Sequence, residues 1–381
     1  MTQTAEMTDT SSASASRSTA SSRDLRAIDH ATTDLELVEE VLAAHFRQHA
    51  PTLLGVGHEL APVVDAVSAR IGGGKRLRAA FCLWGARGAT QGLTAPGIVE
   101  MAAAIELFHL AALVHDDVMD DSDTRRGLPT VHRQFADDHL RARRRGDAER
   151  HGTAVAILVG DMCLSWSDDL VATAVDTVDR DTRRAVRRTW SEMRDEAYGG
   201  QYLDMLSQTE AATDADRTAR ILRYKSARYS IGQPLRLGGT LAGASSALLD
   251  SYDLIGLSAG EAFQLRDDIL GVFGDEKLTG KPAVDDLREG KRTLLIALAE
   301  EAAGRMERRV LSDCLGNPDL DQEGAAQMRD VLESTGALAR VEQRIVDLSE
   351  DALGVVADSQ LDGRTREALT SLIERCVWRT S

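Results

Sequence analysis

The sequence predicts an all-α protein. From about Leu35 onward, apolar residues recur at the i, i+3, i+4, i+7 spacing of an amphipathic helix. Stretches in which β-branched and polar residues alternate, the pattern of a half-buried strand, are missing. The chain has only 7 prolines and 4% aromatic residues, and it is rich in Ala and Leu, which have high helix propensity. These observations favour a bundle of roughly a dozen helices.

Six segments show the helical spacing most clearly. In chain order they are LELVEEVLAAHF (35–46), LAPVVDAVSARI (60–71), VEMAAAIELFHLAALV (99–114), AILVGDMCLSWSDDLVATAV (156–175), LLIALAEEAA (294–303) and ALARVEQRIVDL (337–348). Each is long enough to place one apolar face against a shared core. We therefore expect all six to be helices.

The predicted organisation is one domain behind a short tail. Residues 1–25 are rich in Ser, Thr and Ala and have little to bury, so we expect them to be disordered. A transit peptide is the alternative, but Glu6 and Asp9 are acids that such peptides avoid. No Pro/Gly-rich linker follows, which favours a single domain over residues 30–381. One charged, apolar-poor stretch, 136–152, is predicted to be an exposed connection.

Charge and composition exclude several classes of protein. The formal net charge of −16 disfavours general binding to nucleic acid, even though the run RARRR (141–145) is basic. The best candidate for a membrane span, TAVAILVG at 153–160, is far shorter than the roughly 20 residues required, so no transmembrane segment is expected. The 4 cysteines have no metal-ligand spacing and indicate buried thiols in a reducing cytoplasm.

The segment LVHDDVMDDSDTRRGLPT (113–130) concentrates acids at the end of an apolar helix. A continuous helix places Asp116 and Asp120 on one face, about one turn apart, where their carboxylates can bridge a hard cation. A calcium loop is excluded because Arg125 and Arg126 fall where such a loop needs an oxygen ligand and a glycine. Two interpretations remain, namely a solvated acidic turn and a site in which acidic and basic groups bind one ligand.

A second acidic helix end favours the interpretation as a ligand-binding site. In EAFQLRDDILGVFGD (261–275), Asp267 and Asp268 follow another apolar helix, with Gln264 one turn earlier. Two facing acidic ends would form a magnesium site. Because Mg²⁺ is usually held by one or two carboxylates together with substrate phosphates, the pattern predicts a phosphorylated substrate.

Basic residues that suit such a substrate occur in isolated clusters. IGGGKRLRAA (71–80) combines glycines with Lys75, Arg76 and Arg78, where backbone amides and cations can cradle a diphosphate. It lacks the spacing of a nucleotide P-loop. The other clusters are Arg125 with Arg126, Lys225 in YKSAR, and LTGKPAVDDLREGKRT (278–293). His109 lies on the face of Asp116, two turns deeper, and is either a diphosphate ligand or a core residue.

The chain resembles the trans-isoprenyl diphosphate synthases, also called polyprenyl synthetases, and most of all geranylgeranyl diphosphate synthases. The resemblance runs from about Leu35 to the C-terminus. Its motifs are GGKRLR, ELFHLAALVHDDVMDDSDTRRGLPT, GD at 160–161, GGQYLD at 199–204, YKSA, FQLRDD and GKPAVDDLREGKRT. It implies an all-α isoprenoid-synthase-type bundle around a deep central cavity, and a homodimer.

The resemblance also implies roles for individual residues. Asp116, Asp120 and Asp267 match Mg²⁺ ligands, and Asp117 supports them. The pocket for isopentenyl diphosphate matches Gly74, Lys75, Arg78, His109 and Arg126. Contacts to the allylic diphosphate (dimethylallyl, geranyl or farnesyl) match Arg125, Lys225, Gln264 and Lys281, which are expected to be catalytic together with the three aspartates and Asp117.

The second acidic motif departs from the family pattern DDxxD. Gly271 stands where the third acid is usual, so the two motifs are not expected to bind metal equally. Asp275 would reach the site only if the helix continued through Gly274, which glycine at a helix end disfavours. Ala79 also replaces a common proline in the basic motif.

The implied reaction is head-to-tail prenyl transfer, in which an allylic C–O bond ionises and isopentenyl diphosphate attacks the cation. The helix before Asp116 would form the wall that limits product length. Ala112 and Phe108 lie roughly 6 and 12 Å below Asp116 at 1.5 Å per residue. Small Ala111 and Ala112 leave the upper channel open, and Phe108 is either its floor or a core residue. This favours the twenty-carbon geranylgeranyl product.

Alternative readings remain. The product can be farnesyl or longer. A terpene cyclase shares the fold, but GGKRLR and RRG argue against it. A non-catalytic partner subunit of a heteromeric synthase is the alternative from a different class of protein, with Gly271 as its motivating feature.

Overall fold

The structure, a computed structural model, describes residues 22–209, 215–274 and 284–379. Most of the predicted tail, residues 1–21, lies outside this range, and the first helix begins at Ser22. The elements up to residue 174 are α1 (Ser22–Val56), η1 (His58–Leu60), α2 (Ala61–Ile71), α3 (Leu77–Ala89), α4 (Ile98–Met119), β1 (Thr124–Arg125), β2 (Leu128–Pro129), α5 (Val131–Arg141) and α6 (Ala148–Ala174).

The second part of the chain is helical throughout its described residues. The elements are α7 (Arg180–Gln208), α8 (Ala215–Ile221), η2 (Leu222–Gly232), α9 (Gln233–Leu241), α10 (Ser246–Phe273), α12 (Asp285–Arg288), α13 (Leu294–Ala302), α14 (Arg305–Cys314), α15 (Gln322–Ser334), α16 (Ala337–Asp358) and α17 (Gly363–Val377). The all-α prediction is confirmed, and each of the six predicted segments lies within a helix or extends past its end by one residue.

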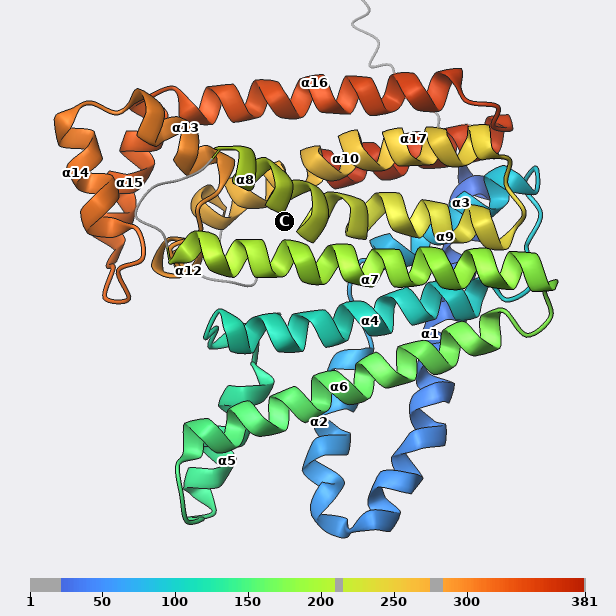
Figure 1. Cartoon of the computed structure of the whole chain (residues 1–381), viewed down its shortest axis with the longest axis horizontal. Coiled ribbons are helices and arrows are strands. Elements are labelled where there is room, and N and C mark those ends of the chain that lie inside the picture. The colour runs from blue at the N-terminus through green and yellow to red at the C-terminus, as the bar shows by residue number, and fades with distance from the viewer. Residues whose placement is uncertain (1–21, 210–214, 275–283, 380–381) are drawn as a thin grey trace, which may run out of the picture.

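The long helices form layers. In Figure 1, α16, α10, α7, α4 and α6 follow one another from top to bottom, and α1, α2 and α5 extend below them. Two hydrophobic clusters hold the layers together. One gathers around α10 and α16, and the other around α4 and α6. The four cysteines are buried free thiols, as predicted.

Helix α4 lies at the centre of the second cluster. It contacts α1, α3, α6 and α9, and its middle residues, from Met101 to Phe108, are almost all fully buried. By length and mean hydropathy (1.6), Ile98–Met119 could also cross a membrane, which corrects the expectation that no segment approaches that length. However, 61% of its apolar window is buried inside the protein. The apolar character of α4 therefore reflects its place in the core.

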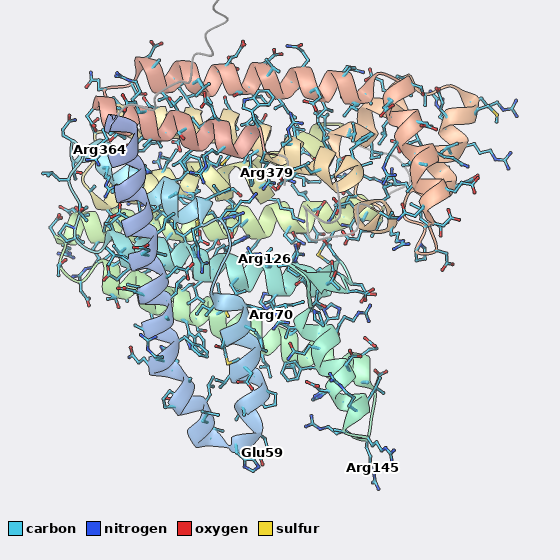
Figure 2. All side chains as sticks on the ribbon, turned by 180° about the vertical axis from the view of Figure 1, so that it is seen from behind. Glu59, Arg70, Arg126, Arg145, Arg364 and Arg379 are labelled. Carbon is cyan, nitrogen blue, oxygen red and sulfur yellow. The ribbon has the colours of Figure 1, made fainter. Side chains whose placement is uncertain are left out.

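Two local predictions need correction. The stretch 136–152 is not one exposed connection, because Ala136 to Arg141 belong to α5 and α6 begins at Ala148. The turn between these helices, residues 142–147, is exposed, and Arg145 stands at its tip (Figure 2). Leu140 of α5 and Glu149 of α6 are exposed as well. The sequence also showed no strand signal, yet Thr124–Arg125 pairs with Leu128–Pro129 in a small antiparallel hairpin.

Close helix contacts fix the position of the basic motif at the start of α3. A Cβ atom added at Gly85 would collide with the backbone of Leu235, and one added at Gly238 would collide with the backbone of Cys82. Helices α3 and α9 therefore approach each other at backbone distance, which only glycine permits. This contact holds α3 against the segment of chain that begins with η2.

Buried Glu106 connects the basic motif to α4. Its Oε1 accepts a hydrogen bond from the Ala79 backbone N–H (3.0 Å), and its Oε2 lies 3.2 Å from Arg76 Nη1. Arg76 also donates to Glu39 of α1 (2.7 Å). Arg76, which sequence reasoning grouped with the diphosphate cluster, is therefore an anchor between three helices, and Lys75 and Arg78 on either side of it remain available to the site.

Candidate active site

A cavity of about 700 Å³ opens between α4, α7, η2 and α10. Most of the residues singled out in the sequence line it, namely Gly74, Lys75, Arg78, Phe108, His109, Ala112, Asp116, Arg125, Arg126, Lys225, Gln264 and Asp267. Asp117, Asp120 and Ala111 are not among the lining residues, and Lys281 and Asp275 lie outside the described residues. Segments that lie more than a hundred residues apart in the sequence thus line the same cavity.

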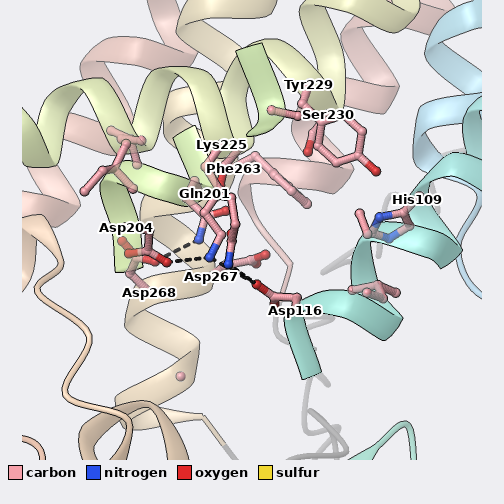
Figure 3. A pocket seen from close by; sticks show the side chains of 18 of the residues that line it. His109, Asp116, Gln201, Asp204, Lys225, Tyr229, Ser230, Phe263, Asp267 and Asp268 are labelled. Atoms are coloured by element: carbon pink, nitrogen blue, oxygen red, sulfur yellow. Dashed lines mark hydrogen bonds and ion pairs between the residues drawn. The ribbon is translucent and has the colours of Figure 1, made fainter. Parts of the chain in front are cut away.

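The first acidic motif occupies the C-terminal end of α4. The helix ends at Met119, and Asp120 caps it, with its N–H bonded to the Asp116 carbonyl (2.8 Å). Asp116 points into the cavity, where its Oδ1 accepts from Gln201 Nε2 (3.0 Å) and lies 3.3 Å from Lys225 Nζ (Figure 3). Burial acts to raise the pKa of Asp116, but Lys225, Lys291 and Arg125 outweigh it and lower that pKa. Asp116 is therefore ionised.

Asp117 faces the other way and has a supporting role. It is buried, and its Oδ1 accepts from Arg125 Nε at 2.7 Å. Arg125 begins the turn of the β1–β2 hairpin, in which Arg126 and Gly127 both have positive φ (53° and 74°). Positive φ at both central residues is typical of a tight hairpin turn. Asp117 thus orients the hairpin that presents both arginines to the cavity.

Asp120 is bound to a lysine that sequence reasoning did not single out. Lys291 Nζ lies 3.5 Å from Asp120 Oδ2, 3.0 Å from Asp286 Oδ1 and 2.5 Å from Glu289 Oε2. Burial lowers the pKa of Lys291, but these acids outweigh it and raise that pKa well above its usual value. Burial and neighbouring Asp116 raise the pKa of Asp120 to about 6. Three carboxylates therefore share one ammonium group as their counter-ion.

The second acidic motif lies on the last two turns of α10. Asp267 lines the cavity and pairs with Arg379, whose guanidinium packs 4.4 Å from the centre of the Phe263 ring. Asp268 is half-buried and accepts from Gln264 Nε2 at 2.8 Å. Burial raises the pKa of Asp268 to about 7. Gln264, expected to contact diphosphate, here supports Asp268.

The third position of this motif is filled from another segment. Gly271 lines the cavity, and a Cβ atom built on it would lie 2.9 Å from Asp286 Cγ and still closer to Asp286 Oδ2. Asp286, on the short helix α12, therefore places its carboxylate where a side chain at 271 would begin. The helix ends as expected, because α10 stops at Phe273 and Gly274 is extended.

The basic pocket lies deeper and next to α4. Arg78 Nη1 lies 3.2 Å from His109 Nε2, and Arg78 Nη2 donates to Ser230 Oγ at 2.8 Å. The guanidinium also stacks 4.7 Å from the centre of the Tyr229 ring. Burial and the nearby arginines, first Arg78 and then Arg126, hold the pKa of His109 well below its usual value. His109 is therefore a neutral imidazole fixed by Arg78.

Glycine is required at one position of this pocket. Gly74 has φ of 91°, and a Cβ atom there would lie 3.1 Å from Arg126 Nη1. A side chain would be strained and would displace the guanidinium.

The segment η2, which carries Lys225, Tyr229 and Ser230, is a π-helix of 11 residues. Its wider turns follow the α-helix α8 without interruption. Segments of π-helix are rare and frequent at functional sites. Here the widened helix turns Lys225 towards Asp116 and Asp204, and Ser230 towards Arg78 (Figure 3).

Aromatic residues close the end of the cavity below the acids. Phe108 and Ala112 line it, whereas Ala111 is buried in the neighbouring core. The Phe108 ring makes edge contacts with Trp190 (5.7 Å) and Tyr229 (5.6 Å) and a tilted contact with Tyr198 (6.1 Å). Phe108 is thus both part of the core and part of the cavity wall, so the two interpretations left open by the sequence are compatible.

The acidic residues fit a divalent cation. Asp120 Oδ1 is buried and has no hydrogen-bond partner, which is costly unless a ligand satisfies it. Asp116 and Asp267 reach the same cavity from two different helices and are neutralised by lysine and arginine. Carboxylate oxygens with room for further oxygen ligands suit a hard cation such as Mg²⁺.

Several functional residues were missed by sequence reasoning. They are Gln201, Asp204, Glu106, Lys291 and Arg379, all of which line the cavity. Gln201 and Asp204 belong to GGQYLD, and Lys291 belongs to GKPAVDDLREGKRT, so the motifs themselves were the available signal. Arg379 stands alone near the end of the chain and has no such signal.

The fold and the site together define a helical protein with a cavity whose mouth is lined by acidic and basic side chains and whose interior is apolar. The polyprenyl synthetase family pattern matches residues 62–332, and the chain belongs to this family. It is a prenyltransferase, because prenyl chain elongation is the activity of the family.

Relatives that are named as prenyl diphosphate synthases agree with this assignment to the family. The chain is 34% identical over 312 residues to geranylfarnesyl diphosphate synthase of Aeropyrum pernix, which covers 81% of this chain and 91% of that protein. It is 29% identical over 276 residues to geranylgeranyl diphosphate synthase of Saccharolobus solfataricus, covering 72% of each. It is also 29% identical over 309 residues to nonaprenyl diphosphate synthase of Mycobacterium tuberculosis, covering 81% and 83%.

Solved structures share the fold. Geranylgeranyl pyrophosphate synthase from Corynebacterium glutamicum, in complex with isoprenyl diphosphate and magnesium, superposes with a TM-score of 0.84 at 37% identity and covers 90% of this chain and 98% of that one. Polyprenyl synthase from Caulobacter crescentus, with calcium and isoprenyl diphosphate, superposes with a TM-score of 0.77 at 26% identity, covering 94% and 98%. Divalent metals accompany isoprenyl diphosphate in both neighbours.

Proposed function

We propose that this chain condenses isopentenyl diphosphate with allylic diphosphates, head to tail and with Mg²⁺, and that its main product is geranylgeranyl diphosphate. The observation that carries the proposal is the meeting of two acidic helix ends, those of α4 and α10, at one cavity. Cations flank the acids, and aromatic side chains close the hollow below them. This is what a substrate with a diphosphate head and a hydrocarbon tail requires.

Asp116, Asp120 and Asp267 are the residues we assign to Mg²⁺, with Asp286 nearby in the place of the missing third acid. Bound Mg²⁺ supplies Lewis-acid stabilisation of the charge on departing pyrophosphate. Lys225 and Lys291 pair with these acids in the metal-free protein. When metal takes their place, the two lysines become available to the diphosphate oxygens. Gln201 and Arg125 keep Asp116 and Asp117 in orientation.

The basic pocket suits isopentenyl diphosphate. Lys75, Arg78 and Arg126 supply positive charge, and neutral His109 offers a hydrogen bond without adding further repulsion. Gln264 and Lys281 remain assigned to the allylic diphosphate, Gln264 by a change from its present contact with Asp268. Apolar and aromatic walls exclude water, which would otherwise capture the allylic cation.

Product length follows from the wall of α4. Ala112 lies one turn below Asp116 and leaves the upper channel open, and Phe108, roughly 12 Å below Asp116, forms the floor. A channel of that depth favours the twenty-carbon product over the fifteen-carbon farnesyl product. Buried Trp190 packs against the Phe108 ring, and Tyr198 contacts the same ring, which favours a fixed position for Phe108.

A second copy of the chain is the proposed partner, and the cytoplasm the proposed location. Leu158 of α6 and Leu140 of α5 are each 62% exposed, and Ile157 is 45% exposed. Large apolar side chains left exposed on two helices that pack against each other favour an interface. The four buried free thiols fit a reducing compartment.

The direct test is incubation of the purified protein with Mg²⁺, isopentenyl diphosphate and each allylic primer in turn, followed by chain-length analysis. We expect pyrophosphate release and a geranylgeranyl product. Asp116→Asn should lower kcat by at least about a hundredfold. No release with any primer would support the alternative, a non-catalytic partner subunit. Release from an allylic substrate without isopentenyl diphosphate would indicate a cyclase.

A further inference from the structure

A cluster of side chains far from the aspartate motifs has the chemistry of a transition-metal site. His45 and His49 lie one turn apart on α1, and Asp169 faces them from α6. One ligand atom from each of the three lies within 4.8 Å of the other two. Two imidazoles and one carboxylate are a ligand set that suits Zn²⁺ and similar ions, not the oxygen-seeking Mg²⁺.

We propose that His45, His49 and Asp169 form a Zn²⁺ site that connects α1 to α6. The site is independent of prenyl transfer. Three protein ligands leave a fourth position for water, which is common for Zn²⁺.

His45 carries the strongest evidence for a ligand. Its Nε2 atom is shielded from solvent and makes no hydrogen bond of good geometry with any of the described residues, although the ring lies close to the backbone of Trp166. A buried polar atom without a partner is rare because its desolvation is not compensated. Burial and then the neighbouring His49 lower the pKa of His45, and they outweigh Asp169 and the backbone of Trp166, which act to raise it. A lower pKa favours the neutral ring, which is the form that binds metal. A metal ion bound at Nε2 would satisfy the atom.

The pairing of His49 with Asp169 is incomplete without an ion. His49 Nε2 lies 3.9 Å from Asp169 Oδ2, which is too long for a hydrogen bond. Ligand atoms on a tetrahedral Zn²⁺ lie about 3.4 Å apart, given Zn–N distances near 2.0–2.1 Å. The Asp169 side chain is 60% exposed and has the freedom to close this difference.

The surroundings hold the two imidazoles in place. The His49 ring packs 4.9 Å from the Trp166 ring, and the His45 ring stands edge-on to Trp166 at 6.4 Å. Phe46 contacts the same indole at 6.5 Å. Trp166 lies one turn before Asp169 on α6, so the aromatic contacts and the carboxylate come from one face of that helix. Rigid support of this kind is what a metal site requires.

The test is calorimetric titration of the metal-free full-length chain with Zn²⁺ in the presence of excess Mg²⁺, which occupies the aspartate motifs. We expect one Zn²⁺ per chain. His49→Gln and Asp169→Asn should each weaken binding about tenfold or more, since even residues that only support a ligand have effects of that size. Asp169→Asn keeps the shape of an exposed side chain and should fold normally.

Two histidine variants serve as controls. His58→Gln removes an exposed ring. His151 lies in the first turns of α6, far along that helix from Asp169, and His151→Gln breaks its ring pair with His139 of α5. Both variants should still bind one Zn²⁺ per chain. A second readout is Trp166 fluorescence, which Cu²⁺ bound beside the indole should quench in the parent and not in His49→Gln. Equal Zn²⁺ affinity in the parent, His49→Gln and Asp169→Asn would overturn the proposal. A parent protein that binds no Zn²⁺ when excess Mg²⁺ is present would overturn it as well.

Discussion

The carboxylate of Asp286 occupies the space that a side chain at Gly271 would need. The two residues come from different helices, α10 and α12, and a Cβ atom at 271 would lie 2.9 Å from Asp286 Cγ. The usual third acid of the second motif is thus absent from the helix, and an acid from a later segment stands in its place. Restoring the family residue at 271 should therefore harm this protein.

The first prediction concerns Gly271→Asp. The new carboxylate would collide with Asp286 and add a like charge to a buried acidic site, so we expect a loss of about 2 kcal/mol or more in the free energy of unfolding. Adding Asp286→Ala to Gly271→Asp should recover much of this loss and restore Mg²⁺ binding. Urea unfolding and calorimetry with Mg²⁺ measure both effects.

A glycine in the last turns of another helix provides the control. Gly354 of α16 is exposed, and a Cβ atom there would meet nothing within 4 Å. Gly354→Asp should change stability by less than about 1 kcal/mol. If Gly271→Asp is no more harmful than Gly354→Asp, Asp286 does not fill the site in solution.

The second prediction concerns Lys291→Gln. Removing the ammonium group leaves Asp120, Asp286 and Glu289 close together without their shared counter-ion. Breaking a buried charge pair from one side typically costs about 3–5 kcal/mol. We expect the metal-free variant to unfold at lower urea concentration and Mg²⁺ to recover part of the loss, because the cation replaces the missing charge.

An exposed ion pair gives the comparison for Lys291. Arg340 and Glu301 pair on the surface, with side chains 52% and 68% exposed. Arg340→Gln should cost at most about 1 kcal/mol and should show no recovery with Mg²⁺. Similar Mg²⁺ effects on both variants would argue against Lys291 as the counter-ion of the acidic site.

The third prediction concerns product length. Ala112→Phe places a ring in the channel one turn below Asp116, so the main product should shorten by at least one five-carbon unit. Phe108→Ala removes the floor and should lengthen the product, although it also opens a core cavity that costs about 3–5 kcal/mol. Chromatography of dephosphorylated products measures both. An unchanged product from Ala112→Phe would mean that α4 does not set the length.

The fourth prediction concerns pH. Burial raises the pKa of Asp268 to about 7 in the folded protein, whereas an unfolded aspartate titrates near 3.9. The folded state therefore binds a proton that the unfolded state has released, and stability falls as pH rises from about 4 through 7. Between pH 6 and 8 this carboxyl should account for a loss of about 1 kcal/mol.

Metal-free protein unfolded in urea at pH 6 and pH 8 tests this. Asp268→Asn should remove most of the decrease, because the amide does not titrate. Asp330, exposed on α15, gives the matched control, and Asp330→Asn should keep the decrease of the parent. If the parent and Asp268→Asn lose equal stability, Asp268 is ionised throughout this range.

The helices were predictable because their signal is local. An apolar face repeats every turn in segments such as 99–114, and burial of that face is what forms the helix. The same reasoning placed Asp116 and Asp120 on one side of α4. The β1–β2 hairpin was not predictable from alternation, since each strand has two residues and only the turn at Arg126 and Gly127 carries information.

Pairings between distant segments were the part that sequence could not supply. Asp286 beside Gly271, Arg379 beside Asp267 and Lys225 beside Asp116 join residues whose sequence separation says nothing about distance. The same holds for the direction of side chains near the end of α4. Asp116 turns into the cavity and Asp117 turns towards Arg125, a difference that only the packed helix decides.

Lys225 and Lys291 have a consequence for how the cavity fills. Each ammonium sits among carboxylates that a metal would otherwise have to neutralise, so part of the negative charge at the mouth of the cavity is already offset. Binding of metal and substrate is thus an ion exchange. The metal ions replace the lysines as partners of the carboxylates, and the lysines then pair with the phosphates of the substrate. Such a chain has no need of metal to assemble after synthesis, and it should refold in a chelating buffer and become active on later addition of the ion.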